Sequence, residues 1–175
     1  MWSFNLGEDN PLLFIAKDKM IAFFDVNPTY ANYLRQFDSK IPNISYSSNN
    51  KFVCGIVLQI SQFNYFAPIS SNRAKQQTNI LIEDDKGNIL SSIKFSFMFP
   101  APLSEVSRKD FELIRQLDPA YADLLSKEYK FCKLNENAIY NKAKKIYAIG
   151  YNPKHILFPH CCDFRLLEEK CKEYK

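Results

Sequence analysis

"KFVCGIVLQISQFNYFAPISSNRAK", residues 51–75, joins two apolar runs to a polar segment. The first run, 51–60, is rich in branched apolar side chains and predicts a buried strand. The second run, FNYFAP, predicts another strand that leads into YFAPISSNRAK (65–75). Two hydroxyls and two cations lie close together in that segment, which is more than a plain turn needs. It is therefore either a polar connection or a segment that contacts phosphate.

Strand signals continue on both sides of this stretch. IAFFDV (21–26) predicts an earlier strand. TNILIE (78–83) and NILSSIKFSFMF (88–99) flank DDKG (84–87), which is a hairpin signal. Five predicted strands in the first hundred residues, joined by short links, favour a curled antiparallel sheet or a partly closed barrel.

A helix is predicted directly after the first strand. Asn27 is suited to the N-cap and Pro28 to the first helical position. The next aromatic and aliphatic residues share one helix face, which we expect to belong mostly to the core: Tyr30, Tyr33, Leu34 and Phe37. Residues 38–50 have the composition of a loop.

The second half of the chain is predicted to be helical. Its helix boundaries are indicated by capping residues and helix breakers: Ser107 with Asp110, Asp118 with Pro119, a break near 135–137, Gly150 and Asp163. Strands that precede helices predict the α+β class, here a curled sheet with added helices in the C-terminal half.

Composition places the chain among folded proteins without membrane spans. With 175 residues and 46% hydrophobic content, residues 1–175 are expected to form a single domain. No signal peptide or membrane-spanning stretch is expected. The five cysteines are odd in number and unevenly spaced, which favours reduced thiols in the cytoplasm. The net charge of +4 is concentrated in residues 127–175, and this suits either a polyanionic partner or a solvated helix face.

Several kinds of site are disfavoured by the residues present. His155 and the HCC run at 160–162 lack the two spaced ligand pairs that zinc usually needs, so we expect no metal and no cofactor. No nucleophile elbow surrounds the serines at 70–71, and no phosphate-cradling P-loop or dinucleotide fingerprint occurs.

The kind of site that is not disfavoured is one that cleaves a phosphodiester bond with protein hydroxyl groups and cationic side chains. RNA supplies its own nucleophile, the 2′-OH, so the protein needs to position it and stabilise charge. Ser70 and Ser71 can donate to phosphate oxygens, and Arg73 can hold two of them. Lys51, at the head of the neighbouring predicted strand, can reach the same place if the two strands pair. By composition alone, a polar loop with ordinary surface cations explains the same residues.

Aromatic side chains supply candidate base-stacking groups. Tyr30, Tyr46 and Tyr65 are predicted to stack on exposed bases, and Tyr33 and Lys75 complete the candidate RNA-binding set.

The chain contains, in this order, the segments FFDVNPTYANYLRQFDSKIPN (23–43), KFVCGIVL (51–58), YFAPISSNRAK (65–75), IKFSFMFP (93–100) and CDFRLLEEK (162–170). Together these five segments resemble the ToxN/AbiQ family of toxins of type III toxin–antitoxin systems. The resemblance covers residues 21–175 and implies a fold similar to the Kid/MazF toxin barrel, extended by helices. Residues 1–20 have no counterpart and form an N-terminal extension, and the native start is either Met1 or Met20.

The resemblance also implies an activity and partners. It implies a metal-independent endoribonuclease that cuts single-stranded, often adenine-rich, RNA and leaves a 2′,3′-cyclic phosphate. The implied partners are cellular or phage mRNA and a cognate antitoxin RNA of pseudoknot repeats, which the toxin processes and with which it forms a closed ring. Abortive infection against phage is the implied role. A non-catalytic RNA-binding protein on the same barrel is the alternative, and a DNA-directed relative is more distant.

By position, the family's catalytic cluster falls on Lys51, Ser70, Ser71 and Arg73, with Tyr30 beside it. Ser70 stands where threonine is usual, and Arg73 stands where the family has lysine. Arginine holds phosphate but does not release its proton, so Lys51 or a serine-bound water becomes the candidate proton donor. Asn72 replaces a proline, which predicts a less rigid loop, and Lys75 is near enough to substitute for the shifted lysine.

Overall fold

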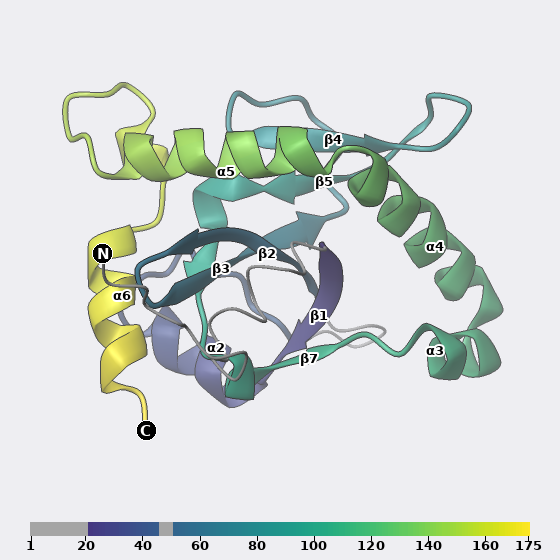
Figure 1. Cartoon of the computed structure of the whole chain (residues 1–175), viewed down its shortest axis with the longest axis horizontal. Coiled ribbons are helices and arrows are strands. Elements are labelled where there is room, and N and C mark those ends of the chain that lie inside the picture. Colours follow the sequence, from purple (N-terminus) through teal and green to yellow (C-terminus); the bar gives the residue numbers. More distant parts are fainter. Residues whose placement is uncertain (1–20, 46–50) are drawn as a thin grey trace, which may run out of the picture.

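The hairpin of β2 (Val53–Ile60) and β3 (Phe63–Ser70) lies at the centre of an antiparallel sheet (Figure 1). A computed structural model describes residues 21–45 and 51–175. The proposed extension, with its apolar run 12–16, lies outside the described residues. The hairpin register runs from Val53–Pro68 to Ile60–Phe63, with one bulge between Gly55 and Leu58.

Seven strands form the sheet in the described ranges, in the order β4-β5-β3-β2-β1-β7, with β6 also paired to β3. The remaining strands are β1 (Ala22–Val26), β4 (Asn79–Glu83), β5 (Ile89–Lys94), β6 (Phe99–Pro100) and β7 (Val106–Arg108). The sheet stays open because β4 and β7 lie at its two ends and do not pair with each other. The predicted α+β class and curled antiparallel sheet are confirmed.

Two sequence predictions of local structure are wrong. NILSSIKFSFMF is not one strand, because the 3-10 turn η1 (Phe95–Phe97) separates β5 from β6. This turn lets β3 pair with β5 near Ser70 and with β6 near Tyr65. Ser107 does not begin a helix; it lies in β7 and pairs with Asp25 of β1. Pairing with β1 gives the backbone of residues 106–108 hydrogen-bond partners on a neighbouring strand, which a helix-capping motif does not provide.

Most helix boundaries match their predicted capping residues. Asn27, Asp118 and Asp163 each accept a hydrogen bond from a backbone N–H of the first turn, and Asp110 rather than Ser107 does so for α3. The helices are α2 (Pro28–Arg35), α3 (Phe111–Leu117), α4 (Pro119–Leu134), α5 (Glu136–Gly150) and α6 (Phe164–Glu173). The predicted break near 135–137 is present, since α4 ends at Leu134 and α5 begins at Glu136.

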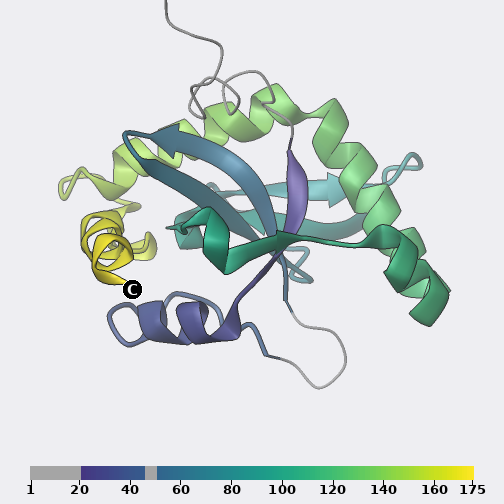
Figure 2. The ribbon, with the colours of Figure 1, turned by 60° about the horizontal axis from the view of Figure 1, so that its bottom comes forward.

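The helices surround the sheet at different places. α6 lies beside α2 at one end of the molecule, and α3 lies at the other end (Figures 1 and 2). α5 contacts β2 and η1, whereas α4 contacts β4 and β5. Within the described ranges, none of the helices combines the length and the apolar character that a membrane crossing requires.

The core is aromatic and leaves two glycines in close contact with rings. A Cβ atom on Gly55 would lie 2.2 Å from Cδ1 of Phe66, its partner across the hairpin. A Cβ atom on Gly150 would lie 2.4 Å from the ring of Phe164. The prediction that α5 closes at Gly150 is confirmed, and the structure shows that the missing side chain also makes room for α6.

We expect Gly55→Ala to lower the free energy of unfolding by about 3 kcal/mol, because the buried Phe66 ring must move. Gly87→Ala is the control: Gly87 has a φ of 79° but no atom within 4 Å of its Cβ position. It should lose only about 1 kcal/mol through backbone strain. Urea unfolding of both variants checks this, and equal losses would show that Phe66 has room to shift.

Candidate functional site

The β2–β3 pairing brings Lys51 next to Ser70. Ile69 N donates to Phe52 O at 3.2 Å at the end of the hairpin. Continuing this register by one residue places Lys51 opposite Ser70, and directly opposed residues of an antiparallel pair share a face. The two strands therefore pair as the approach of Lys51 to the serines requires.

The polar segment begins later than the sequence suggests. Residues 65–70 belong to β3, and the side chains at 65–69 are buried in the core. Ser70 is half-buried and pairs with Ser92 of β5. Ser71 is the first exposed residue after the strand. Ser71 thus lies at the point where a rigid strand meets solvent, which is a suitable place for a group that binds a ligand.

Hydrogen bonds restrain the start of the loop 71–78, even though Asn72 replaces the family proline. Asn72 N donates to Ser70 Oγ at 3.2 Å, and the Asn72 side chain accepts from Ala74 N at 2.8 Å. The buried Ser92 hydroxyl donates to Asn72 O at 2.6 Å. These hydrogen bonds supply restraint by a different route from a proline ring.

Arg73 is exposed and anchored at one edge. Its Nε donates to Leu90 O of β5 at 3.3 Å. Within the described ranges this is the one hydrogen bond of its guanidinium group, so the terminal N–H groups remain for a ligand. A guanidinium held in this way can present a fixed fork of donors to phosphate oxygens.

The predicted stacking role does not fit Tyr30 and Tyr65, because both rings are fully buried. Tyr30 Oη donates to Pro100 O at 2.7 Å, and Tyr65 Oη donates to Glu168 Oε1 at 2.7 Å. Burial raises the pKa of both hydroxyls far above the ordinary tyrosine value. A base could reach these rings only if the core opened.

Of the other two predicted stacking or RNA-binding tyrosines, Tyr33 is within the described residues and Tyr46 is not. Tyr33 is partly buried, and its Oη donates to Lys170 O of α6 at 3.1 Å. Its ring packs against Tyr30, Phe37 and Tyr174. Tyr46 lies outside the described residues, so its predicted role stays a prediction.

Glu168 is a partly buried anchoring residue that the sequence analysis missed. Its carboxylate accepts from Tyr65 Oη, from Tyr147 Oη at 2.8 Å and from Tyr151 Oη at 2.9 Å. These bonds connect α6 to β3 and to the C-terminal end of α5, where Tyr147 and Tyr151 lie. In the sequence, the i, i+4 spacing of Tyr147 and Tyr151 was the available signal, because it places both hydroxyls on one side of the helix, where they need a shared partner.

The histidine and cysteine residues near 160 are used within the fold. His155 Nδ1 accepts from Leu157 N at 3.1 Å. Cys161 and Cys162 are buried, and burial raises the pKa of each thiol. Among the described residues, no group of three or more His, Cys, Asp or Glu side chains is arranged to hold a metal ion.

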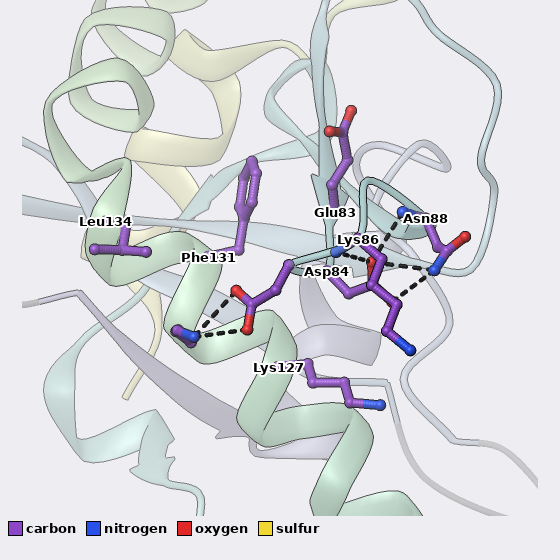
Figure 3. A pocket seen from close by; sticks show the side chains of 9 residues that line it. Glu83, Asp84, Lys86, Asn88, Lys127, Phe131 and Leu134 are labelled. Carbon is purple, nitrogen blue, oxygen red and sulfur yellow. Dashed lines mark hydrogen bonds and ion pairs between the residues drawn. The ribbon is translucent and has the colours of Figure 1, made fainter.

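Two cavities lie away from the loop 71–78. One, of about 400 Å³, lies between the β4–β5 turn and α4 (Figure 3). Asp84 accepts from Asn88 and Lys86 there, and Asp85 forms an ion pair with Lys130. The hydrogen bonds from Asn88 lower the pKa of Asp84. The second cavity, of about 420 Å³, lies beside Asn27 and Glu105. Neither is lined by a predicted catalytic residue.

Comparison with known proteins shows a match along most of the chain. The family model for toxin ToxN of type III toxin–antitoxin systems matches residues 22–172. Endoribonuclease ToxN of Bacillus thuringiensis subsp. kurstaki is 32% identical over 162 residues, which are 87% of this chain and 84% of that protein. Endoribonuclease AbiQ of Lactococcus lactis subsp. lactis is 29% identical over 88% of this chain and 89% of its own length.

Solved structures show the same likeness in three dimensions. A structure from work on selective toxin inhibition by a non-coding RNA pseudoknot has a TM-score of 0.83 and 31% identity, over 88% of this chain and 97% of that chain. The structure of AbiQ, described as a lactococcal anti-phage endoribonuclease, has a TM-score of 0.79 and 26% identity. It covers 89% of this chain and 98% of its own.

We expect Ser92→Ala to loosen the loop 71–78, because Asn72 O is then left without its buried donor. The free energy of unfolding should fall by about 1 kcal/mol, and amide hydrogens of residues 72–74 should exchange faster by mass spectrometry. Ser91→Ala is the control, since Ser91 is also buried on β5 but points to the other face of the strand. Equal exchange in the two variants would mean that Ser92 does not restrain the loop.

Proposed function

The chain belongs to the ToxN toxin family of type III toxin–antitoxin systems, and we propose that it is an endoribonuclease that cleaves single-stranded RNA at the loop 71–78. The observation that supports this proposal is the β2–β3 register, which places Lys51 opposite Ser70 at the start of the exposed segment that holds Ser71 and Arg73. The relatives named endoribonuclease, at 29–32% identity, support it.

The proposed reaction is a transesterification within the RNA. The 2′-oxygen forms a bond to phosphorus as the bond from phosphorus to the 5′-oxygen breaks, which leaves a 2′,3′-cyclic phosphate and a 5′-hydroxyl. Ser71 Oγ and the terminal N–H groups of Arg73 donate to the non-bridging oxygens, where negative charge grows in the phosphorane. This reaction does not call for a metal ion, since the protein positions the reacting atoms and its hydrogen bonds stabilise the growing charge.

Two protons have to move in this reaction, and the residues differ in their ability to move them. One passes from the 2′-OH to solvent water, and one is delivered to the 5′-oxygen. Arg73 keeps its proton under all relevant conditions and therefore serves as a phosphate ligand. Lys51, opposite Ser70, can donate a proton to the leaving oxygen and is the proposed general acid.

Substrate and partners are proposed from the relatives. One related structure concerns toxin inhibition by a non-coding RNA pseudoknot, and another concerns a processed non-coding RNA that regulates an antiviral system. We propose a repeated pseudoknot RNA as the antitoxin, bound in a closed ring, and adenine-rich cellular or phage mRNA as the substrate. Residues 21–175 would form the ribonuclease, acting in the cytoplasm in abortive infection.

Ser71→Ala should slow RNA cleavage by about 10²- to 10³-fold, the reduction expected when one donor to a developing oxyanion is removed. Cleavage of a labelled adenine-rich RNA in EDTA, with end-group analysis for cyclic phosphate, measures it. Ser107→Ala, at an exposed serine of β7, should cleave like the unchanged protein.

The alternative is a protein that binds RNA without cleaving it, and the departures from the family residues at Asn72 and Arg73 suggest it. The same assay distinguishes the two functions. If the unchanged protein retains intact RNA in EDTA and no cyclic phosphate forms, the enzyme proposal fails and the binding protein remains. Full activity of Ser71→Ala at matched concentration would remove Ser71 from the site.

Lys51→Arg should lower kcat by about 10²-fold or more while KM changes little, because the charge is kept but the side chain can no longer transfer a proton. Steady-state cleavage kinetics of the two proteins measure both constants. A normal kcat in Lys51→Arg would assign Lys51 to phosphate binding alone.

A further inference from the structure

The loop 71–78 is held in place from beneath on both sides of Lys75. Asn79 is 2% exposed, and its Nδ2 donates to Ala74 O at 2.9 Å. Its Oδ1 accepts from Gln76 N at 3.0 Å. One buried amide therefore fixes the residues immediately before and after Lys75, so the backbone at this exposed cation is fixed in position.

A buried lysine supports the same part of the loop. Lys94 is 5% exposed at the end of β5, and its Nζ donates to Gln76 Oε1 at 2.8 Å. Within the described ranges it forms no ion pair, so its partner is a neutral amide. Burial lowers the pKa of Lys94.

Two further lysines belong to α5, which packs against η1. Phe95 N of η1 donates to Thr78 O at the end of the loop at 3.2 Å, so this helix and the loop lie close together although they are distant in the sequence. Lys142 and Lys145 lie one turn apart on the helix, on neighbouring positions of its surface. Burial lowers the pKa of Lys142, and the charges of Lys145 and Lys75 lower it further.

These lysines contrast with others in the same protein. Lys130, Lys133 and Lys170 each form an ion pair with a carboxylate. Across residues 21–45 and 51–175, neither Lys75 nor the two lysines of α5 forms one. Like charges gathered without a counter-charge repel one another, and a polyanion relieves that repulsion.

We propose that Lys75, Lys142 and Lys145 form a subsite for an RNA backbone phosphate that flanks the cleaved one. Asn79 and Lys94 are its positioning residues, since they hold the loop and do not reach the ligand. Lys75 follows Ser71 in the same loop. An RNA chain that crosses the loop from the serines therefore reaches the lysines next. The subsite rests on the proposed function, because it extends the path of the same RNA.

The test compares two double variants with equal changes in charge. Lys142→Gln/Lys145→Gln removes two lysines of the subsite, and Lys144→Gln/Lys154→Gln removes two exposed lysines from the same helix and the following loop. The probe is a mixed-sequence, single-stranded 2′-O-methyl RNA, which lacks the 2′-OH nucleophile. Its Kd is measured by fluorescence anisotropy over a series of salt concentrations, and thermal unfolding confirms that both variants fold.

The subsite variant should bind about tenfold more weakly, as expected when one charge-assisted hydrogen bond to phosphate is removed. The slope of log Kd against log salt should fall by about 0.7 for each phosphate that the protein no longer neutralises. The control variant should match the unchanged protein, and cleavage by the subsite variant should show a raised KM with kcat retained.

Equal affinities and equal salt slopes in the two double variants would overturn the subsite. Cleavage by the unchanged protein is measured in parallel, so the two proposals fail separately. If the unchanged protein cleaves RNA and the double variants do not differ, the subsite alone is wrong. If it does not cleave, the endoribonuclease proposal is wrong, and the binding comparison still decides the subsite.

Discussion

The pairing of β2 with β3 is the constraint on which the rest of the structure depends. Because Gly55 faces the ring of Phe66, the two strands approach closely in the register that pairs Val53 with Pro68. That register carries Lys51 to the end of β3, opposite Ser70, the last residue of the strand. A shift by one residue would turn Lys51 and Ser70 to opposite faces and would also expose the apolar residues that form the core.

The second edge of β3 is divided between two partners, and this division shapes the candidate site. β6 pairs near Tyr65 and β5 pairs near Ser70, with the 3-10 turn η1 between them. β5 therefore lies under the loop 71–78, where its side chains replace water as hydrogen-bond partners for the backbone. The loop is exposed to a ligand on one side and restrained by buried polar groups on the other.

Local patterns predicted much of this, for physical reasons that are local themselves. Caps such as Asn27 and Asp163 were correct, because a capping side chain bonds to its own helix. Ser107 was assigned to a helix because its pairing with β1 depends on a distant strand. Tyr30 and Tyr65 were expected to stack on bases, since an aromatic residue in a sequence does not reveal which side of the sheet is covered by helices.

By itself the sequence determined the class of the fold, the succession of strands and then helices, and a segment rich in hydroxyls and cations. These depend on periodicity, propensity and composition, which neighbouring residues carry. Only the tertiary structure decided that Asn79 and Lys94 lie beneath the loop 71–78, and that α5 brings Lys142 towards Lys75. Charges and hydrogen bonds act over a few ångströms in space, and no local pattern specifies which distant segments come that close.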